Sequence, residues 1–316
     1  MTVALLFSPQ GSQAVGMGRE LADASPAARA VFAEADATLG WPVSRTCWDG
    51  PVERLNDTRQ TQPCLLTTSV AALRALEEQA SPDPSFVAGH SVGEYAALVA
   101  AGVLRFDAAL RLVARRGALM ADLDTEGGMA AVIGLPRATV EQVVEAVGRP
   151  TDLVVANDNA PGQVVISGTH AALAAVDEPM KAAGARRVIR LPVSGAFHSP
   201  LMASVSEDLR ESFETEAWSD ARVPVVSNVT AEPVTDAGRI RALLAEQVRS
   251  PVEWVRVIER MRDDGAGTMI ELGEGSALVG MVRRIAPDVI GLAVHDGSSL
   301  AAAVELLGAG VEAGVS

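Results

Sequence analysis

A glycine-flanked serine between a strand-like and a helix-like segment is the feature that most constrains the fold of this chain. Residues 89–93 read Gly-His-Ser-Val-Gly, after the apolar stretch 86–88 and before the apolar run 95–101 that Gly102 ends. This G-x-S-x-G pattern, with a strand before it and a helix after it, predicts a sharp turn that exposes the hydroxyl of Ser91. Side chains at the two flanking positions would collide with the crossing backbone, so both are glycine.

The helix that follows the serine adds a second expectation. Its first turn would point free N–H groups and the positive end of the helix dipole toward Ser91, where an oxyanion would form. The pentapeptide alone is only moderately specific in a chain with 28 glycines, so an ordinary glycine-bounded turn is the alternative. The flanking strand and helix favour a nucleophilic serine.

Length and composition indicate a globular protein with an ample core. The chain has 316 residues, 48% of them hydrophobic, which suits one large domain or two modest ones. It holds no apolar run of about 18 residues, so we expect no membrane span. The net charge of −14 argues against nucleic-acid binding. Residues 1–7 read as a strand rather than a signal peptide, and Cys47 and Cys64 lack metal-ligand spacing, so we expect a cytoplasmic protein without a metal.

Two regions with the strand and helix pattern of an α/β domain flank a middle region with a different order of elements. The flanking regions predict strands at 2–7, 224–227 and 268–272 and helices at 26–39, 61–80, 107–123, 239–248 and 252–263. Asp107 is the expected N-cap of the third of these helices. The middle region predicts, in order, a strand at 129–135, a helix at 136–147, strands at 153–156 and 163–167, a helix at 169–183 and a strand at 187–193. This β-α-β-β-α-β order is typical of a ferredoxin-like domain, inserted here between two halves of a larger one.

An arginine lies on the apolar side of the predicted helix 107–123. Leu112, Arg116 and Leu119 share one narrow stripe at a period of 3.6 residues. A buried cation is costly unless an anion meets it. Either Arg116 makes a structural ion pair, or its partner arrives with the substrate.

Four histidines are candidates for the base that a serine nucleophile needs. His90 adjoins the serine and should point away from it, while His170 lies at a predicted helix start. His198 lies in the Gly- and Pro-bounded loop 194–200, where the chain returns to the larger domain, and is favoured because catalytic side chains concentrate on such loops. His295 is the alternative. No carboxylate stands out as a third member, and a main-chain carbonyl or an amide would also fix the tautomer of the base.

Short segments along the whole chain carry a family resemblance. They are residues 10–13, 16–18, 61–63, 89–95, 116–117, 119–120, 157, 159, 161–168, 195–202, 227–230, 247, 251–252 and 254. In these segments the chain resembles the malonyl-CoA:acyl-carrier-protein transacylases, the acyltransferase family of fatty-acid and polyketide synthesis. The resemblance implies an α/β-hydrolase-like large domain over 1–126 and 195–316, a ferredoxin-like small domain over 127–194, and a site between them.

The resemblance also implies roles for particular residues. Ser91 would be the acylated nucleophile, His198 its base, and Gln247 would orient that base through its main-chain carbonyl. The main-chain N–H groups of Gln10 and Val92 would form the oxyanion hole. Arg116 would pair with the free carboxylate of the substrate. Other expected substrate-binding residues are Gln62, Met120, Phe197 and Asn228.

The activity that the resemblance implies is ping-pong transfer of a malonyl group from CoA to the phosphopantetheine thiol of an acyl carrier protein. No metal or redox cofactor and no second copy of the chain would be needed. The alternatives are a polyketide-pathway acyltransferase or editing acyl hydrolase with a different acyl group, and a non-catalytic module that docks carrier proteins. The first loop departs from the family: residues 7–11 read Phe-Ser-Pro-Gln-Gly where Phe-Pro-Gly-Gln-Gly is usual. Pro9 lacks an N–H, but Gln10 keeps its own. The sequence indicates no role for Asp158.

Overall fold

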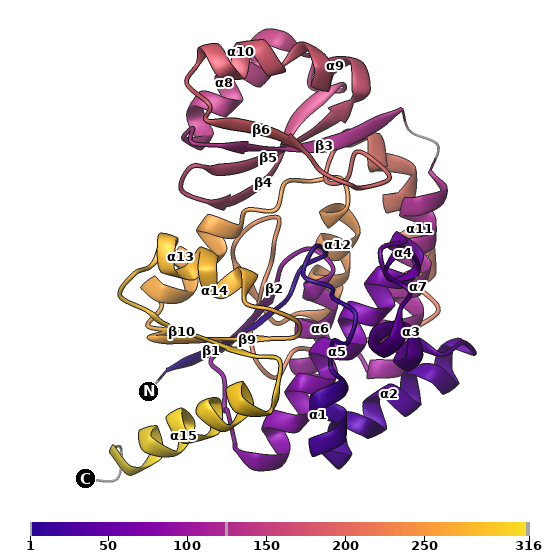
Figure 1. The fold of residues 1–316 in the computed structure, drawn as a ribbon, viewed down its shortest axis with the longest axis vertical. Helices are drawn as coiled ribbons and strands as arrows, with labels where there is room; N and C mark the ends of the chain where they lie inside the picture. Colours follow the sequence, from indigo (N-terminus) through magenta and orange to yellow (C-terminus); the bar gives the residue numbers. More distant parts are fainter. Residues whose placement is uncertain (1, 124–125, 314–316) are drawn as a thin grey trace.

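The computed structural model describes residues 2–123 and 126–313 and contains two β-sheets (Figure 1). The larger sheet has six strands, in spatial order β10 (Ile290–Val294), β9 (Thr268–Leu272), β1 (Val3–Phe7), β2 (Phe86–Gly89), β7 (Val225–Val226) and β8 (Pro233–Val234). Strand β1 pairs in parallel with both β2 and β9, and only β8 runs antiparallel to its neighbour. The predicted strands at 2–7, 224–227 and 268–272 all belong to this sheet.

Both faces of the larger sheet are covered, because its central strand is apolar on both sides. Leu5 and Phe7 of β1 pack into one core, whereas Ala4 and Leu6 pack into another. The first core includes α2 (Pro26–Leu39), α5 (Thr58–Gln79), α6 (Gly93–Ala100) and α7 (Phe106–Asp122); the second includes α13 (Trp254–Asp263) and α14 (Ala277–Ile285). A parallel sheet between two helical layers is the α/β architecture that the sequence predicted.

The smaller sheet is antiparallel, and helices cover one of its faces. Its spatial order is β4 (Leu153–Ala160), β5 (Gln163–Thr169), β3 (Gly127–Ile133) and β6 (Arg187–Arg190). The helices α8 (Arg137–Val147), α9 (His170–Ala175) and α10 (Asp177–Ala182) lie on the side away from the larger sheet (Figure 1). The predicted ferredoxin-like order is confirmed. The domain limits at 126/127 and 194/195 stay predictions, and the first adjoins residues 124–125, which lie outside the described residues.

Several helix limits differ from the sequence prediction. The helix predicted from residue 61 begins at Thr58, after the N-cap Asp57. Asp107 was expected to cap α7 but lies inside its first turn, where its carboxylate bonds Arg105 and Arg111; the N-cap position is Arg105. The helix predicted over 169–183 is two helices, α9 and α10. Pro179 falls in the first turn of α10, where a proline removes no helical hydrogen bond.

Other elements were not predicted at all. They are α1 (Arg19–Ala24), α3 (Val43–Asp49), α4 (Val52–Leu55), the 3₁₀ turn η1 (Pro200–Met202), α11 (Ala203–Phe213), β8, α14, β10 and α15 (Gly297–Ala313). Among the described helices, none combines the length and the apolarity that crossing a membrane requires.

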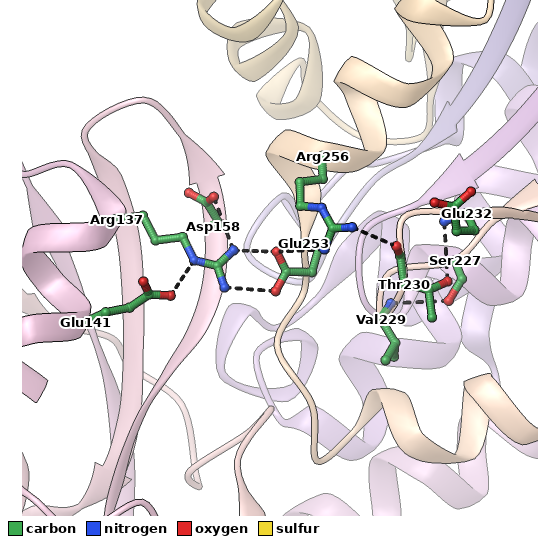
Figure 2. A network of polar contacts seen from close by, with 9 residues as sticks. All are labelled: Arg137, Glu141, Asp158, Ser227, Val229, Thr230, Glu232, Glu253 and Arg256. Atoms are coloured by element: carbon green, nitrogen blue, oxygen red, sulfur yellow. Dashed lines mark hydrogen bonds and ion pairs between the residues drawn. The ribbon is translucent and has the colours of Figure 1, made fainter. Parts of the chain in front are cut away.

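A network of ion pairs joins the smaller sheet to the larger domain (Figure 2). Arg137, in the first turn of α8, donates hydrogen bonds to both carboxylate oxygens of Glu253, with 2.9 Å between Nη2 and Oε1. The same guanidinium bonds Glu141 at 2.7 Å and Asp158 of β4 at 3.4 Å. Glu253 immediately precedes α13, so this arginine connects the two domains and gives Asp158 a structural role.

Main-chain hydrogen bonds reinforce the same junction. The N–H of Val252 donates to the carbonyl of Ala156 over 2.8 Å, and the N–H of Asp158 donates to the carbonyl of Val252 over 3.0 Å. The N–H of Glu253 donates to the carbonyl of Asn228 over 2.8 Å. Strand β4 is therefore held against the larger domain both by its backbone and by charge.

Arg137→Met should destabilise the protein by about 1–3 kcal/mol, because it removes the hydrogen bonds of two mostly buried carboxylates, those of Asp158 and Glu253, and leaves Glu253 only Arg256 at 4.0 Å. Urea denaturation would measure the loss. Arg74→Met is the matched control, since Arg74 and Glu77 form an exposed pair one helical turn apart, and should cost about 1 kcal/mol or less. Equal losses in the two variants would show that the junction is no stronger than a surface pair.

Candidate active site

The turn that carries Ser91 joins β2 to α6 in a strained conformation. Ser91 has a φ of 53°, in the left-handed region that few side chains adopt. A Cβ on Gly89 would lie 2.0 Å from the backbone of Gly93, and a Cβ on Gly93 would lie 2.2 Å from the carbonyl oxygen of Phe7. The steric reason predicted for the two glycines is thus confirmed.

Asn228 holds this turn from beneath. Its Oδ1 accepts a hydrogen bond from the N–H of Ser91 over 2.7 Å, and its Nδ2 donates to the carbonyl of Gly89 over 2.7 Å. The side chain is completely buried. The structure shows one hydrogen bond from each of its polar atoms to the main chain of the turn, so Asn228 positions the serine. Our expectation that Asn228 also binds substrate stays a prediction.

Ser91 and His198 form a hydrogen-bonded pair. Ser91 Oγ lies 2.7 Å from His198 Nε2, and His198 Nδ1 lies 2.8 Å from the main-chain oxygen of Gln247. A carbonyl oxygen can only accept, so Nδ1 carries the hydrogen and Nε2 has the free lone pair that faces the serine. The predicted arrangement of these three residues is the observed one. His198 also has a positive φ, 56°, so strain falls on both members of the pair.

The other three histidines have different neighbours. His90 Nε2 bonds Asn159 Oδ1 at 2.8 Å, and its ring packs against Trp254. His295 neighbours Asp296 at 3.5 Å, and His170 begins α9. None of these three side chains is hydrogen-bonded to the hydroxyl of Ser91, whereas His198 is, so the geometry favours His198 among the four.

Burial keeps the two histidines at the turn neutral. Desolvation, followed by the nearby Arg116 cation, lowers the pKa of His198 to about 3. Desolvation lowers the pKa of His90 to about 4. His198 can therefore accept a proton from Ser91 throughout the neutral pH range.

Arg116 of α7 is buried beside the serine, with 1% of its surface exposed. Its Nη2 donates to Ser91 Oγ over 3.1 Å and to Gln247 Oε1 over 3.0 Å, and its Nη1 donates to Gln62 Oε1 over 2.8 Å. Its Nε is buried without a partner among the described residues. All of these acceptors are neutral oxygens, so the structural ion pair considered for Arg116 is not formed with any described carboxylate.

The side chain of Gln62 is hydrogen-bonded to Arg116. Besides accepting from Arg116, its amide nitrogen contacts Gln10 Oε1 at 3.5 Å and Met120 Sδ at 3.4 Å. The side chain is fully buried and does not line the cavity beside Ser91. Direct substrate binding by Gln62 stays a prediction, and the contact that the structure shows is its hydrogen bond with Arg116.

A cavity of about 130 Å³ opens beside the serine, between the two domains. From the larger domain it is lined by Pro9, Gln10, His90, Ser91, Met120, Phe197 and His198. From the smaller domain and its return segment it is lined by Met129, Asn157, Asn159, Val165, Leu191 and Val193. Met120 and Phe197 are thus placed where sequence analysis put them, whereas the two asparagines were not predicted as lining residues.

The first loop reaches the serine because β1 and β2 are parallel neighbours. Phe7 is in register with Gly89, and the N–H of His90 donates to the carbonyl of Phe7 over 3.2 Å. Gln10 and Val92, the predicted oxyanion donors, therefore lie on adjacent turns. Their main-chain N–H groups have no acceptor among the described residues.

A buried carboxyl that sequence analysis missed completes the site. Glu94, in the first turn of α6, accepts a hydrogen bond from Gln247 Nε2 over 2.6 Å. The only local signal was its place directly after Gly93. Within 2–123 and 126–313, no cluster of His, Cys, Asp and Glu side chains could hold a metal ion.

Comparison with known proteins agrees with this geometry. The family model for the acyl transferase domain matches residues 4–300, and the chain belongs to that family. It is 42% identical over 308 residues to the malonyl CoA-acyl carrier protein transacylase of Bacillus subtilis, covering 96% of this chain and 97% of that protein. The structure of a malonyl CoA-acyl carrier protein transacylase from Clostridium perfringens superimposes with a TM-score of 0.95 at 34% identity, over 100% of both chains.

A second similar solved structure contains a partner protein. It is a malonyl-transacylase in complex with a type II PKS acyl-carrier protein, similar to this chain with a TM-score of 0.93 and 39% identity, over 96% of this chain and 99% of that one.

Modification of Ser91 by a fluorophosphonate should proceed at a rate without an inflection between about pH 5 and 8. The pKa of His198 is about 3, so the base is neutral across this range. Labelling rates at successive pH values measure this, with Ser91→Ala as the unlabelled control. A loss of reactivity with a midpoint near the ordinary histidine pKa of about 6.5 would contradict the buried, neutral base.

Proposed function

We propose that this protein transfers a malonyl group from malonyl-CoA to the phosphopantetheine thiol of an acyl carrier protein. One observation carries the choice of acyl group: the guanidinium of Arg116 lies 3.1 Å from Ser91 Oγ, and no carboxylate of the described residues is bound to it. A cation in that position fits a substrate that brings its own carboxylate. Membership of the acyl transferase family and the names of the curated relatives support the same reaction.

In the first half-reaction, Ser91 Oγ attacks the thioester carbonyl of malonyl-CoA while His198 Nε2 takes the hydroxyl proton. The carbonyl of Gln247 holds the other ring nitrogen protonated and stabilises the imidazolium that forms. The N–H groups of Gln10 and Val92 would stabilise the tetrahedral oxyanion, each by roughly 3–4 kcal/mol. When the intermediate collapses, His198 returns the proton to the departing CoA thiolate, leaving malonyl-Ser91.

The second half-reaction reverses these roles. The phosphopantetheine thiol of the carrier protein gives its proton to His198 Nε2 and attacks the ester carbonyl. Ser91 leaves and regains the proton from the same nitrogen. One serine, one neutral base and one oxyanion hole therefore serve both steps, which is ping-pong acyl transfer.

Selectivity would come from Arg116, with Gln62 and Gln247 fixing its orientation. A malonyl carboxylate in the buried cavity would form charge-assisted hydrogen bonds with the guanidinium, which an acetyl group cannot make. Phe197 would narrow the cavity near the α-carbon of the acyl group. The same arginine argues against an editing hydrolase of neutral acyl chains.

The proposed function also includes the cofactor requirement, the cellular compartment and the oligomeric state. The nucleophile, base and oxyanion donors all belong to the chain, so the chemistry needs no metal or redox cofactor. Cys47 and Cys64 are buried free thiols, which suits the cytoplasm. All of the residues with proposed roles come from one chain, so a monomer would suffice.

Incubation with malonyl-CoA should add one malonyl group to the protein, and Ser91→Ala should abolish this adduct in intact-mass analysis. Ser85→Ala is the matched control, because Ser85 is exposed just before the same strand, and its adduct should persist. An adduct of undiminished yield on Ser91→Ala would disprove the nucleophile. Parallel incubations with methylmalonyl- and acetyl-CoA would define the acyl preference.

Arg116→Ala should reduce kcat/KM for malonyl-CoA by about 100-fold, because hydrogen bonds to a charged group contribute about 1.5–3 kcal/mol each. Transfer from acetyl-CoA should stay within about threefold of the wild-type rate. Arg115→Ala, an exposed neighbour on the same helix, should change neither. Equal losses for both donors in Arg116→Ala would mean that the arginine is structural.

A further inference from the structure

Glu94 is a buried carboxyl for which the proposed reaction has no use. It lies in the first turn of α6, directly behind the serine turn, with 3% of its surface exposed. No arginine, lysine or histidine of the described residues forms an ion pair with it. Its shortest contact is the hydrogen bond of 2.6 Å that it accepts from Gln247 Nε2. A buried carboxylate without a direct cation is costly, so its retention calls for a physical reason.

The side-chain amide of Gln247 connects this carboxyl to Arg116. Its Nε2 donates to Glu94 and, over 2.9 Å, to the carbonyl of Ser91, while its Oε1 accepts from Arg116 Nη2 over 3.0 Å. An amide nitrogen only donates and an amide oxygen only accepts, so the chain from Arg116 through Gln247 to Glu94 has a single direction. The buried cation and the buried carboxyl thus polarise the same neutral bridge.

We propose that Glu94 is the resident counter-charge of Arg116 in the unacylated protein and that it competes with the substrate carboxylate, which makes Glu94 a determinant of malonyl affinity. This inference rests on the proposed function. A malonyl group brings a second negative charge to a site with one cation. Two carboxylates around one guanidinium repel each other unless one of them takes up a proton. The substrate carboxylate contacts the arginine directly, so Glu94 is the group that is neutralised.

The surroundings of Glu94 make this neutralisation accessible near neutral pH. Burial raises the pKa of Glu94 to about 7, and the Gln247 amide, the Asn228 main chain and the Arg116 cation offset only part of this effect. The other titratable groups of the site keep their charge states: burial raises the pKa of Tyr95 far above neutrality, and that of His198 is about 3. Glu94 is therefore the group of this site that changes its charge around pH 7.

Malonyl binding should consequently be coupled to proton uptake. Bound malonyl removes part of the stabilisation that Arg116 gives to the Glu94 carboxylate, so it raises the pKa of Glu94 further. Malonyl affinity is then highest below about pH 7, and it falls as the pH rises from the pKa of the free site to that of the occupied site. An acetyl group has no carboxylate and should show no such dependence.

Calorimetry on the Ser91→Ala protein tests the coupling without turnover. Malonyl-CoA is titrated near pH 7.5 in two buffers with different ionisation enthalpies, and acetyl-CoA is titrated in the same buffers to subtract protons that belong to the CoA part. We expect malonyl-CoA to take up about half a proton or more in excess of acetyl-CoA. The double variant Ser91→Ala/Glu94→Gln should show no excess uptake.

Kinetics on the active protein provide the second measurement. Glu94→Gln removes the competing charge at constant shape, so at about pH 8 the KM for malonyl-CoA should fall by about fivefold or more. The malonyl-to-acetyl ratio of kcat/KM should decline with rising pH in the wild type and become independent of pH in this variant. Glu274→Gln changes a glutamate that is only partly buried and forms no hydrogen bond with Arg116 or Gln247, so this variant should keep the wild-type profile.

The outcomes separate the two proposals. Malonyl transfer without excess proton uptake, or an unchanged ratio profile in a folded Glu94→Gln protein, overturns the counter-charge and leaves the proposed function intact. A wild-type protein that neither binds nor transfers malonyl overturns the function and the counter-charge together. If Glu94→Gln does not fold, the Ser91→Ala calorimetry still decides, because it needs only the native Glu94.

Discussion

The crossing of two backbones at the serine turn is the constraint on which the rest of the structure depends. The position that a Cβ of Gly93 would take lies 2.2 Å from the carbonyl oxygen of Phe7, so the start of α6 passes over the end of β1 in close contact. Parallel pairing of β1 with β2 sets this approach and brings the loop after β1 to the same edge of the sheet. The strained serine, the helix N-terminus behind it and the oxyanion loop thus form one unit.

Around that unit, the site combines buried charge with neutral partners. Arg116 bonds only neutral oxygens, and His198 faces the serine in its uncharged form because burial and the cation both disfavour a second positive charge. In such a dry environment a single unpaired charge acts strongly on any group that enters. The counter-charge role proposed for Glu94 rests on the same burial, which raises the pKa of this carboxyl to about 7.

The smaller domain completes the cavity through β4, which presents different side chains to its two faces. Asn157 and Asn159 line the cavity, and Asn159 also bonds His90, whereas Asp158 between them turns to the Arg137–Glu253 pair. Asp158 thus serves the attachment to the larger domain (Figure 2), whereas Asn157 and Asn159 serve the cavity. The N–H of Glu253 donates to the main-chain carbonyl of Asn228, and the side chain of Asn228 holds the serine turn. Asn228 therefore connects the attachment of the smaller domain to the serine turn.

Features that depend on near neighbours in the chain could be predicted from the sequence. The need for glycine at 89 and 93 follows from a motif of five consecutive residues. The position of Arg116 on an apolar stripe follows from helical periodicity, and the order of strands and helices in 127–190 follows from short hydrophobic patterns. The family resemblance then assigned Ser91, His198 and Gln247 to one site. The contacts of these side chains could be seen only in the folded structure. Asn228 lies 137 residues from the serine it supports, and Gln247 lies 153 residues from Glu94. Such contacts arise from the packing of separate elements, where a single hydrogen bond leaves no periodic signal in the sequence, and for that reason the partners of Asn228 and Gln62 were not predicted and Glu94 was missed.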